Sequence, residues 1–325
     1  MPATKMAGKW PLLQFVILAF VWGASFLFIE IGLEGLSPAQ VVLGRLCAGA
    51  AALGVVCLVT RRKLPSEPVV WAHLAVVSVL LCVAPFLLFS WAEQSIASGL
   101  ASIYNATTPL MTTLVALVAL PQERPTRARL MGLIAGFAGV LLVLGPWRLV
   151  GGGSIAGQLA CLLATACYGM GFVYLRRFVS PRGLSSLAVA TVQVGLGAAI
   201  MLVMVPWIAT TPVHLTPRIV AAILVLGVAG TGLAYVWNTN LVAAWGAANA
   251  STVTYLTPVV GVSLGVLVLA EPVAWNQPVG ALVVVAGIAI SQGRLAGLAQ
   301  GLRGRLSLRR RGSGDPCHSI LCRGR

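Results

Sequence analysis

The sequence ASIYNATTPLMTTLVALVALPQE at residues 101–123 returns in altered form as ASTVTYLTPVVGVSLGVLVLAE at residues 250–271. The Ala-Ser pair, the Thr-Pro pair and the final Glu correspond, with a separation of 149 residues as far as the proline and 148 at the glutamate. Self-similarity at a fixed separation indicates that one structural unit occurs twice in a chain. The sequence therefore predicts two related halves.

The similarity extends toward the start of each half. The sequence WGASF at residues 22–26 corresponds to YGMGF at residues 168–172 with a separation of 146 residues, and Arg45 corresponds to Gln193 with a separation of 148. Each half then contains five apolar segments. The expected domains are a first five-helix repeat at 12–146, a second repeat at 154–294 and a basic tail at 295–325.

The composition places both halves in a membrane. Hydrophobic residues make up 58% of the 325 residues, charged residues make up 9%, and the mean hydropathy is +0.95. A soluble domain has about 25% charged residues, because it must cover its surface with them. The composition therefore excludes a soluble globular enzyme and indicates an integral membrane protein.

Ten apolar segments are long enough to cross a bilayer, which needs about 20 residues per helix. Their apolar residues run continuously and do not alternate with polar ones, which argues against a membrane β-barrel. The expected fold is an all-α integral membrane protein with ten transmembrane helices. The expected spans are residues 12–32, 38–60, 69–91, 98–120, 127–146, 154–178, 184–207, 217–241, 248–270 and 276–294.

Because five is an odd number, the second repeat is expected to enter the membrane inverted relative to the first. The distribution of basic residues agrees with this. With the N-terminus inside, 19 of the 22 Lys and Arg residues lie on the cytoplasmic side, 2 lie outside, and Arg45 lies within a helix. Cytoplasmic loops carry such an excess. Both termini are therefore predicted to be cytoplasmic. A net charge of +15 would suggest a nucleic-acid partner in a soluble protein, but here the orientation in the membrane explains it, so no nucleic-acid partner is expected.

Several motifs resemble those of a known family. They are the WGASF opening of the first helix, the segment from Pro38 to Arg45-Leu46, the Ala-Ser to Thr-Pro-Leu helix that ends near Glu123-Arg124, and a helix with Gly132, Gly136 and Gly139. This ordered set resembles the drug/metabolite transporter superfamily, EamA type, in both halves. The resemblance implies a ten-helix exporter or exchanger of amino acids, metabolites or drugs in a bacterial inner membrane.

Inverted repeats favour a secondary transporter, because two halves related by an axis in the membrane plane can open one side while closing the other. The expected partners are a small-molecule substrate and the lipid bilayer, and a homodimer is compatible with the sequence. The seven cysteines lack the spacing of a metal site. We therefore expect no cofactor, no metal and no catalytic residue.

Arg45 is the one basic residue that orientation does not explain. It lies seven residues after Pro38, about 10 Å into its helix, where a charge costs about 2.5 to 3.5 kcal/mol. It either faces a central cavity and attracts a carboxylate or phosphate of the substrate, or it binds backbone carbonyls or extends toward the interface. Its counterpart Gln193 is neutral, so a cationic site would be asymmetric.

Pro109 and Pro258 interrupt matching helices of the two halves. Proline removes a backbone hydrogen bond and frees carbonyls, and a matched pair of interrupted helices points to a binding site between repeats. A static kink satisfied by neighbouring threonines is the alternative. Polar and aromatic residues near these breaks and in the facing helices are expected to bind substrate: Trp22, Ser25, Arg45, Asn105, Thr108, Tyr168, Gln193, Tyr235, Asn238, Tyr255 and Thr257.

Packing explains some of these residues equally well, and aromatic residues near helix ends are typical of an interfacial belt. Asn238 and Asn240 cannot face the same direction on a helix, so at most one is expected in a cavity. No Asp or Glu lies near the middle of a predicted helix, so proton coupling would require Glu93 or a less obvious route.

Two other functions stay open at this point. Gly23-Ala24-Ser25-Phe26 resembles the nucleophile motif of intramembrane serine proteases, which would require a histidine base such as His73 within hydrogen-bond reach. A membrane scaffold or channel without alternating access is the second alternative. The repeat favours a carrier over both.

Overall fold

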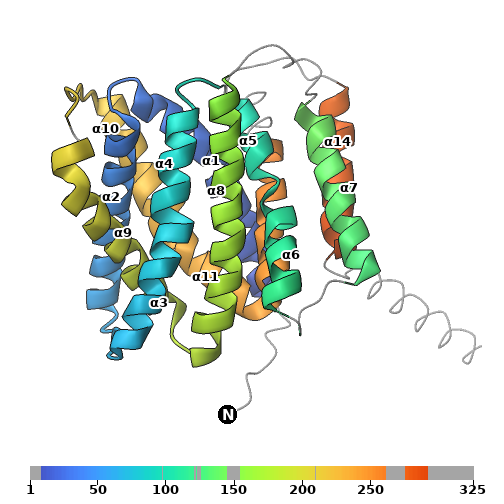
Figure 1. Cartoon of the computed structure of the whole chain (residues 1–325), viewed down its shortest axis with the longest axis horizontal. Coiled ribbons are helices and arrows are strands. Elements are labelled where there is room, and N and C mark those ends of the chain that lie inside the picture. Colours follow the sequence, from blue (N-terminus) through green and yellow to red (C-terminus); the bar gives the residue numbers. More distant parts are fainter. Residues whose placement is uncertain are drawn as a thin grey trace, which may run out of the picture.

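The computed structural model describes residues 9–96, 98–120, 122, 126–144, 154–208, 210–260 and 275–291. Every regular element in these ranges is a helix (Figure 1), so the all-helical prediction is confirmed there. Seven described helices are long and apolar enough to cross a membrane: Trp10–Leu33, Pro38–Val59, Pro68–Ala92, Ala101–Ala119, Ile155–Arg182, Ser186–Trp207 and Pro217–Trp245.

The helices of the first half divide several of these spans into shorter elements. They are α1 (Lys9–Leu33), α2 (Pro38–Val59), α3 (Pro68–Ser78), η1 (Val79–Val83), α4 (Ala84–Ala92), α5 (Ser98–Asn105), α6 (Thr108–Ala119) and α7 (Arg127–Leu144). Those of the second half are α8 (Ile155–Tyr174), η4 (Leu175–Val179), η5 (Ser180–Arg182), α9 (Ser186–Ile208), α10 (Pro217–Gly227), η6 (Val228–Leu233), α11 (Ala234–Trp245), α12 (Ala247–Ser251), η7 (Thr252–Tyr255) and α14 (Asn276–Ser291).

The order of elements repeats between the halves. Helices α2 and α9 begin at residues 38 and 186, which are 148 apart, and helices α7 and α14 begin at 127 and 276, which are 149 apart. The π-helical turns η1 and η6 interrupt the equivalent spans, between α3 and α4 and between α10 and α11. A π-turn inserts one residue into an α-helix and is frequent at functional sites.

Local sequence chemistry fixes where the helices begin. At the start of α2, the Ser37 hydroxyl accepts from the Gln40 amide, while the Ser37 amide donates to Gln40 Oε1 over 2.8 Å. This reciprocal capping box satisfies two otherwise unpaired donors, and Pro38 provides the fixed φ of a first helical turn. Gln40 Nε2 also donates to the Thr211 carbonyl over 2.9 Å, which ties α2 to the segment before α10.

Helices α7 and α14 pack side by side at one end of the bundle (Figure 1). Their backbones meet at glycines, because a Cβ added to Gly287 would lie 2.3 Å from the Gly136 nitrogen. Gly132 and Gly139 are equally close to α14. These contacts make the glycine face of α7 a small-residue packing face. Gly261 and Gly265, which have a similar spacing in the sequence, lie outside the described residues.

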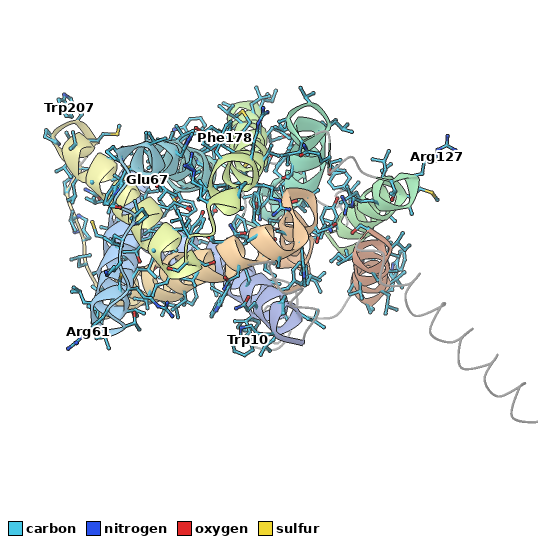
Figure 2. The ribbon with its side chains drawn as sticks, turned by 90° about the horizontal axis from the view of Figure 1, so that it is seen from below. Trp10, Arg61, Glu67, Arg127, Phe178 and Trp207 are labelled. Atoms are coloured by element: carbon cyan, nitrogen blue, oxygen red, sulfur yellow. The ribbon has the colours of Figure 1, made fainter. Side chains whose placement is uncertain are left out.

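The outward surface of the bundle is apolar. Leu58, Val118 and Leu282 are 79%, 85% and 72% exposed. Trp10 and Trp207 also point away from the bundle near helix ends (Figure 2). Such a surface would be unfavourable in water but matches the hydrocarbon of a bilayer, so the chain is a multi-pass membrane protein.

Candidate functional site

A cavity lies inside the bundle, with an empty volume of about 590 Å³ including its opening to solvent. Both halves line the cavity, the first through α1, α2, η1, α4 and α5 and the second through α8, α11 and η7. The lining residues are Trp22, Ser25, Phe26, Ile29, Arg45, Leu81, Phe86, Phe89, Asn105, Tyr168, Phe172, Tyr235, Asn238 and Thr254.

Arg45 extends from α2 into this cavity and is 3% exposed. Its Nε donates to Thr231 Oγ1 in η6 over 3.1 Å, and its Cζ lies 3.6 Å from the centre of the Phe86 ring. Within the described ranges, no carboxylate oxygen lies within 4 Å of the guanidinium and its Nη groups donate to no acceptor. Of the two alternatives for Arg45, the structure has the one in which the side chain lines the cavity.

Close packing of α2 against α10 and η6 brings Arg45 to Thr231. A Cβ added to Gly227 would lie 2.7 Å from the Arg45 carbonyl oxygen, and one added to Gly49 would lie 2.8 Å from the Gly227 carbonyl oxygen. Only glycine allows backbones to approach so closely. These two glycines therefore place a first-half cation on a second-half hydroxyl.

Asn238 reaches the cavity from α11 and is fully buried. Its Nδ2 and Oδ1 atoms are both buried and have no hydrogen-bond partner. Asn240 lies on another face of the helix, where its Oδ1 accepts from the Ser186 hydroxyl of α9. Only one of the two asparagines thus faces the cavity, as helix geometry requires.

Aromatic side chains form much of the remaining wall. Trp22 Nε1 donates to the Gly230 carbonyl over 3.2 Å, and the Trp22 ring meets Tyr235 edge-on at 6.1 Å. On the facing wall, the Phe89 ring lies 5.8 Å from Phe26 and 6.1 Å from Tyr168. Offset and edge-on aromatic pairs hold each other in fixed orientations. The cavity therefore combines a rigid aromatic wall with Arg45 and Asn238.

The two predicted helix breaks lie beside the cavity. Helix α5 ends at Asn105 and α6 begins at Thr108, just before Pro109, while η7 ends at Tyr255, just before Pro258. Asn105 Nδ2 donates to Thr257 Oγ1 over 3.4 Å and joins the breaks. The neighbouring threonines satisfy freed carbonyls, since Thr108 Oγ1 donates to the Asn105 carbonyl over 2.7 Å and Thr257 Oγ1 to the Thr254 carbonyl over 2.8 Å.

Four residues expected to bind substrate lie outside the cavity lining. Thr108 and Thr257 cap the helix breaks, as described above. Gln193 is buried and donates from Nε2 to Cys82 Sγ over 3.3 Å. Tyr255 donates to the Leu133 carbonyl of α7 over 2.8 Å and packs against Gly136. Their polar groups cap helix breaks or join one helix to another, and the sequence alone does not distinguish these roles from binding.

Sequence reasoning missed the phenylalanines of the cavity. Phe26, Phe86 and Phe89 lie in spans that are apolar on every side, so hydrophobicity gives no sign of which face is internal. Phe86 and Phe89 lie three residues apart on α4 and so share one face of that helix. Only the contact between Phe86 and Arg45 shows that this face is the internal one.

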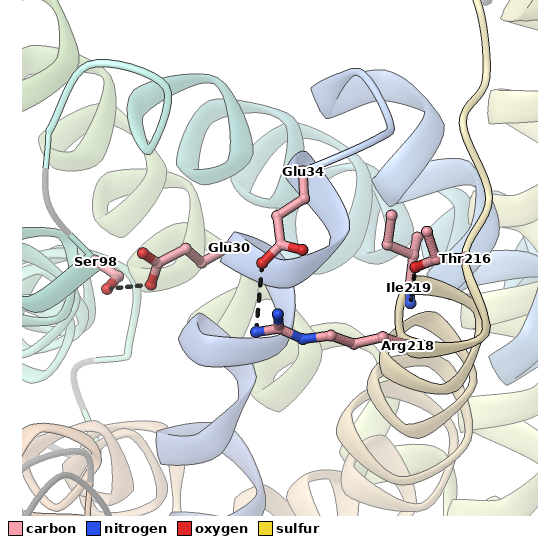
Figure 3. A network of polar contacts seen from close by, with 6 residues as sticks. All are labelled: Glu30, Glu34, Ser98, Thr216, Arg218 and Ile219. Carbon is pink, nitrogen blue, oxygen red and sulfur yellow. Dashed lines mark hydrogen bonds and ion pairs between the residues drawn. The ribbon is translucent and has the colours of Figure 1, made fainter. Parts of the chain in front are cut away.

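The end of α1 nearest Glu93 is polar. Glu30 Oε2 accepts from the Ser98 hydroxyl over 3.2 Å, and Glu34 pairs with Arg218 at 3.4 Å (Figure 3).

Glu93 follows α4, and both of its carboxyl oxygens are buried without a hydrogen-bond partner. It lies beyond the span that ends at Ala92. Burial raises the pKa of the Glu93 carboxyl well above its usual range; Glu30 adds to the shift and Arg45 opposes it.

The structure does not pair Ser25 with His73, as the protease-like alternative would require. The Ser25 hydroxyl donates to the Val21 carbonyl over 2.9 Å. His73 Nδ1 instead lies 2.9 Å from the Tyr174 hydroxyl, and its ring stacks on Phe178 at 5.2 Å. A serine nucleophile needs a base within hydrogen-bond reach. Among the described residues, no three His, Cys, Asp or Glu side chains form a metal-binding group.

Over the described residues, an all-helical bundle with an apolar exterior and a largely aromatic cavity between its halves defines a multi-pass membrane protein. The sequence model of the EamA-like transporter family matches the chain twice, over residues 9–145 and 155–292. The chain belongs to this family, within the drug/metabolite transporter superfamily, and is a transporter rather than an enzyme.

Several similar proteins are named as transporters. "Uncharacterized transporter YoaV" of Bacillus subtilis (strain 168) is 24% identical over 283 residues, which cover 85% of this chain and 94% of that protein. "Uncharacterized inner membrane transporter YedA" of Escherichia coli (strain K12) is 26% identical, with coverage of 76% and 79%. "Probable terminal-alkyne amino-acid exporter" of Streptantibioticus cattleyicolor is 25% identical, with coverage of 87% and 93%.

A solved structure described only as "Crystal structure of protein" has the same fold. It is 20% identical, with a TM-score of 0.71, and the match covers 88% of this chain and 97% of that one.

Proposed function

We propose that this protein is a secondary transporter that exports or exchanges a small metabolite, amino acid or drug by alternating access. The observation that carries the proposal is the cavity whose walls come from both halves. A site between two repeats can face either side of the membrane when one repeat moves relative to the other. The name of the amino-acid exporter similar to this chain supports small amino-acid-like substrates.

The proposed architecture is ten transmembrane helices in two inverted repeats, with both termini in the cytoplasm. The matching order of elements in the two halves supports it, as do the π-turns η1 and η6 at equivalent positions. The breaks at Asn105 and Thr257 are places where helical hydrogen bonding is already interrupted. Helices bend most readily at such points, so the proposed motion is centred on them.

Transport itself is tested by expressing the protein in a sensitive host and measuring efflux of amino acids, amino-acid analogues and cationic drugs. For a compound that is transported, unlabelled compound on the far side of a vesicle membrane should accelerate loss of labelled compound. This acceleration follows because a carrier returns faster when loaded, whereas a channel without alternating access shows none. Flux without acceleration would favour the channel.

A cysteine at position 25 should report occupation of the cavity. In a variant whose seven native cysteines are replaced, Ser25→Cys places a thiol on the cavity wall. We expect a transported compound to slow modification of this thiol severalfold, because it occupies the same space. The rate of reaction with a maleimide measures this.

Thr60→Cys provides the control, since Thr60 lies exposed at the end of α2. Its modification should not depend on the compound. Equal protection at both positions, or protection at neither, would contradict binding in this cavity.

A further inference from the structure

We propose that the cavity binds the carboxylate of its substrate between the Arg45 guanidinium and the Asn238 amide, with a ring-sized apolar group of the substrate against the aromatic wall. The substrate class is thus a small carboxylic acid with one apolar body, which includes apolar and aromatic amino acids. This inference rests on the proposed transport function, because it names what the transporter carries.

The hydrogen bonding of Arg45 favours binding over a structural role. A buried structural arginine normally satisfies carbonyls or pairs with a carboxylate. Arg45 instead makes one hydrogen bond, from Nε to a threonine hydroxyl, and its Nη groups donate to nothing in the described ranges. A guanidinium has five N–H donors arranged to match a carboxylate. Four of these donors therefore remain for a ligand.

Phe86 holds the guanidinium in a defined plane. Its ring centre lies 3.6 Å from Arg45 Cζ, a distance typical of a stacked cation–π pair. Stacking covers one face of the guanidinium but leaves its N–H groups free in the plane. Because Thr231 fixes Nε at the same time, the Nη groups are oriented before any ligand arrives, which reduces the entropy lost on binding.

Asn238 is the second observation, and it is independent of Arg45. It is completely buried, lines the same cavity and has neither a donor for its Oδ1 nor an acceptor for its Nδ2. A buried amide without partners is unfavourable. A carboxylate would accept from Nδ2, and Oδ1 would accept from an ammonium or hydroxyl group of the same ligand.

The charges around the cavity do not cancel Arg45. Three described titratable groups interact electrostatically with Glu93. They are Arg45 on α2 and Cys161 on α8, which both pack against α4, and Glu30 on α1. The η1 thiol, Cys82, interacts with Arg45 instead. Among the described acids, Glu93 is the one that interacts with Arg45, but burial of its oxygens favours the neutral form. The cavity therefore carries a positive charge when Glu93 is protonated.

Three probes test the carboxylate directly on purified full-length protein in lipid nanodiscs. They are 3-phenylpropionate, phenylalanine and phenylalanine amide, which differ in the carboxylate and the amine but share the ring. Binding is measured by isothermal titration calorimetry. We expect both acids to bind about tenfold or more tightly than the amide, because only they can pair with the guanidinium. Equal affinities, or binding of none of the three, would overturn the proposal without requiring any variant.

Variants then assign the residues. Arg45→Gln should weaken binding of 3-phenylpropionate about tenfold and remove the difference between acid and amide, while Arg45→Lys should restore part of it. Asn238→Leu should weaken the acids and the amide alike. Gln193→Leu is the matched control, because Gln193 is also buried with an unpartnered amide oxygen but lies outside the cavity lining. Unchanged selectivity for acids in a folded Arg45→Gln protein would contradict the role of Arg45.

Acid binding should also weaken as pH rises. Below the raised pKa of Glu93 its carboxyl is neutral, and above it the carboxylate repels the bound acid and competes for Arg45. Glu93→Gln should remove this decline, whereas Glu34→Gln, which changes a surface ion pair with Arg218, should leave it. A decline that persists in Glu93→Gln would exclude Glu93 as its origin.

These results separate the substrate class from transport. Binding of acids without flux would refute the proposed transport and leave the carboxylate site in place. Flux of amines or neutral compounds, with no selectivity for acids, would refute the carboxylate site and leave transport in place.

Discussion

Gly287→Leu is expected to separate α7 from α14 and to lower the stability of the whole protein by about 3 kcal/mol or more. The added Cβ would lie 2.3 Å from the Gly136 nitrogen and 2.6 Å from the Gly136 Cα. These are backbone atoms of a regular helix, so no side-chain rotation relieves the contact. The helices would have to move apart.

Separation would also disturb the contacts that hold this pair to the bundle. Tyr255 donates to the Leu133 carbonyl of α7 over 2.8 Å, and its ring packs on Gly136. Since Tyr255 ends η7, movement of α7 would be transmitted to the helix break at Thr257. We therefore expect loss of transport together with loss of stability.

Thermal unfolding in detergent, followed by size-exclusion chromatography, measures the effect. Gly54→Leu is the matched control, because a Cβ at Gly54 in α2 meets no atom within 4 Å. That substitution should be neutral or slightly stabilising, since leucine favours a helix more than glycine by about 0.8 kcal/mol. Equal unfolding temperatures for the two variants would show that the α7–α14 contact is not rigid.

Tyr235→Ala is expected to be similarly damaging, at about 3 to 5 kcal/mol. Tyr235 is 2% exposed and contacts aromatic rings of both α1 and α4, Trp22 at 6.1 Å and Phe86 at 6.4 Å. Its hydroxyl donates to the Leu81 carbonyl in the π-turn η1. The alanine variant would leave a cavity, an unpaired carbonyl and an unsupported Phe86 ring beneath Arg45.

Tyr235→Phe separates these contributions. It keeps the ring and removes only the hydroxyl, so the expected cost is about 1 to 3 kcal/mol, the penalty of one unsatisfied buried carbonyl. Unfolding in detergent and efflux measured on the same preparations distinguish stability from transport. If the phenylalanine variant were as unstable as the alanine variant, the hydrogen bond to η1 rather than the ring packing would dominate.

Much of the fold could be predicted because the membrane imposes it. Apolar length predicted each of the seven described helices that are long enough to cross a membrane, and Pro38, Pro68 and Pro217 each stand at the first position of a helix. The breaks at Pro109 and Pro258 were predictable for the same reason, since proline cannot continue the hydrogen-bond ladder. The π-turns were not predictable, because no residue type demands them.

The polar residues of the candidate site could be predicted, because a polar side chain inside a membrane is energetically costly and therefore stands out. The apolar residues of the site could not be predicted in this way. Arg45 and Asn238 were identified because burial of a charge or an amide requires a reason. Phe86 and Phe89 gave no such signal among apolar neighbours. Tyr255 and Gln193 were assigned to binding because a buried polar group that ties helices together looks the same in sequence as one that faces a ligand.

Because of the π-turn η1, a change of one residue in chain length would change which side chains form the cavity wall. Each residue of an α-helix adds about 100° of rotation, so the extra residue of η1 determines which face of α4 turns inward. Deleting one residue from Val79–Val83 would shorten the span hardly at all, yet it would rotate Phe86 and Phe89 away from Arg45. Relatives that differ by a single insertion or deletion in this turn could thus present different cavity walls while every side chain in α4 stayed the same.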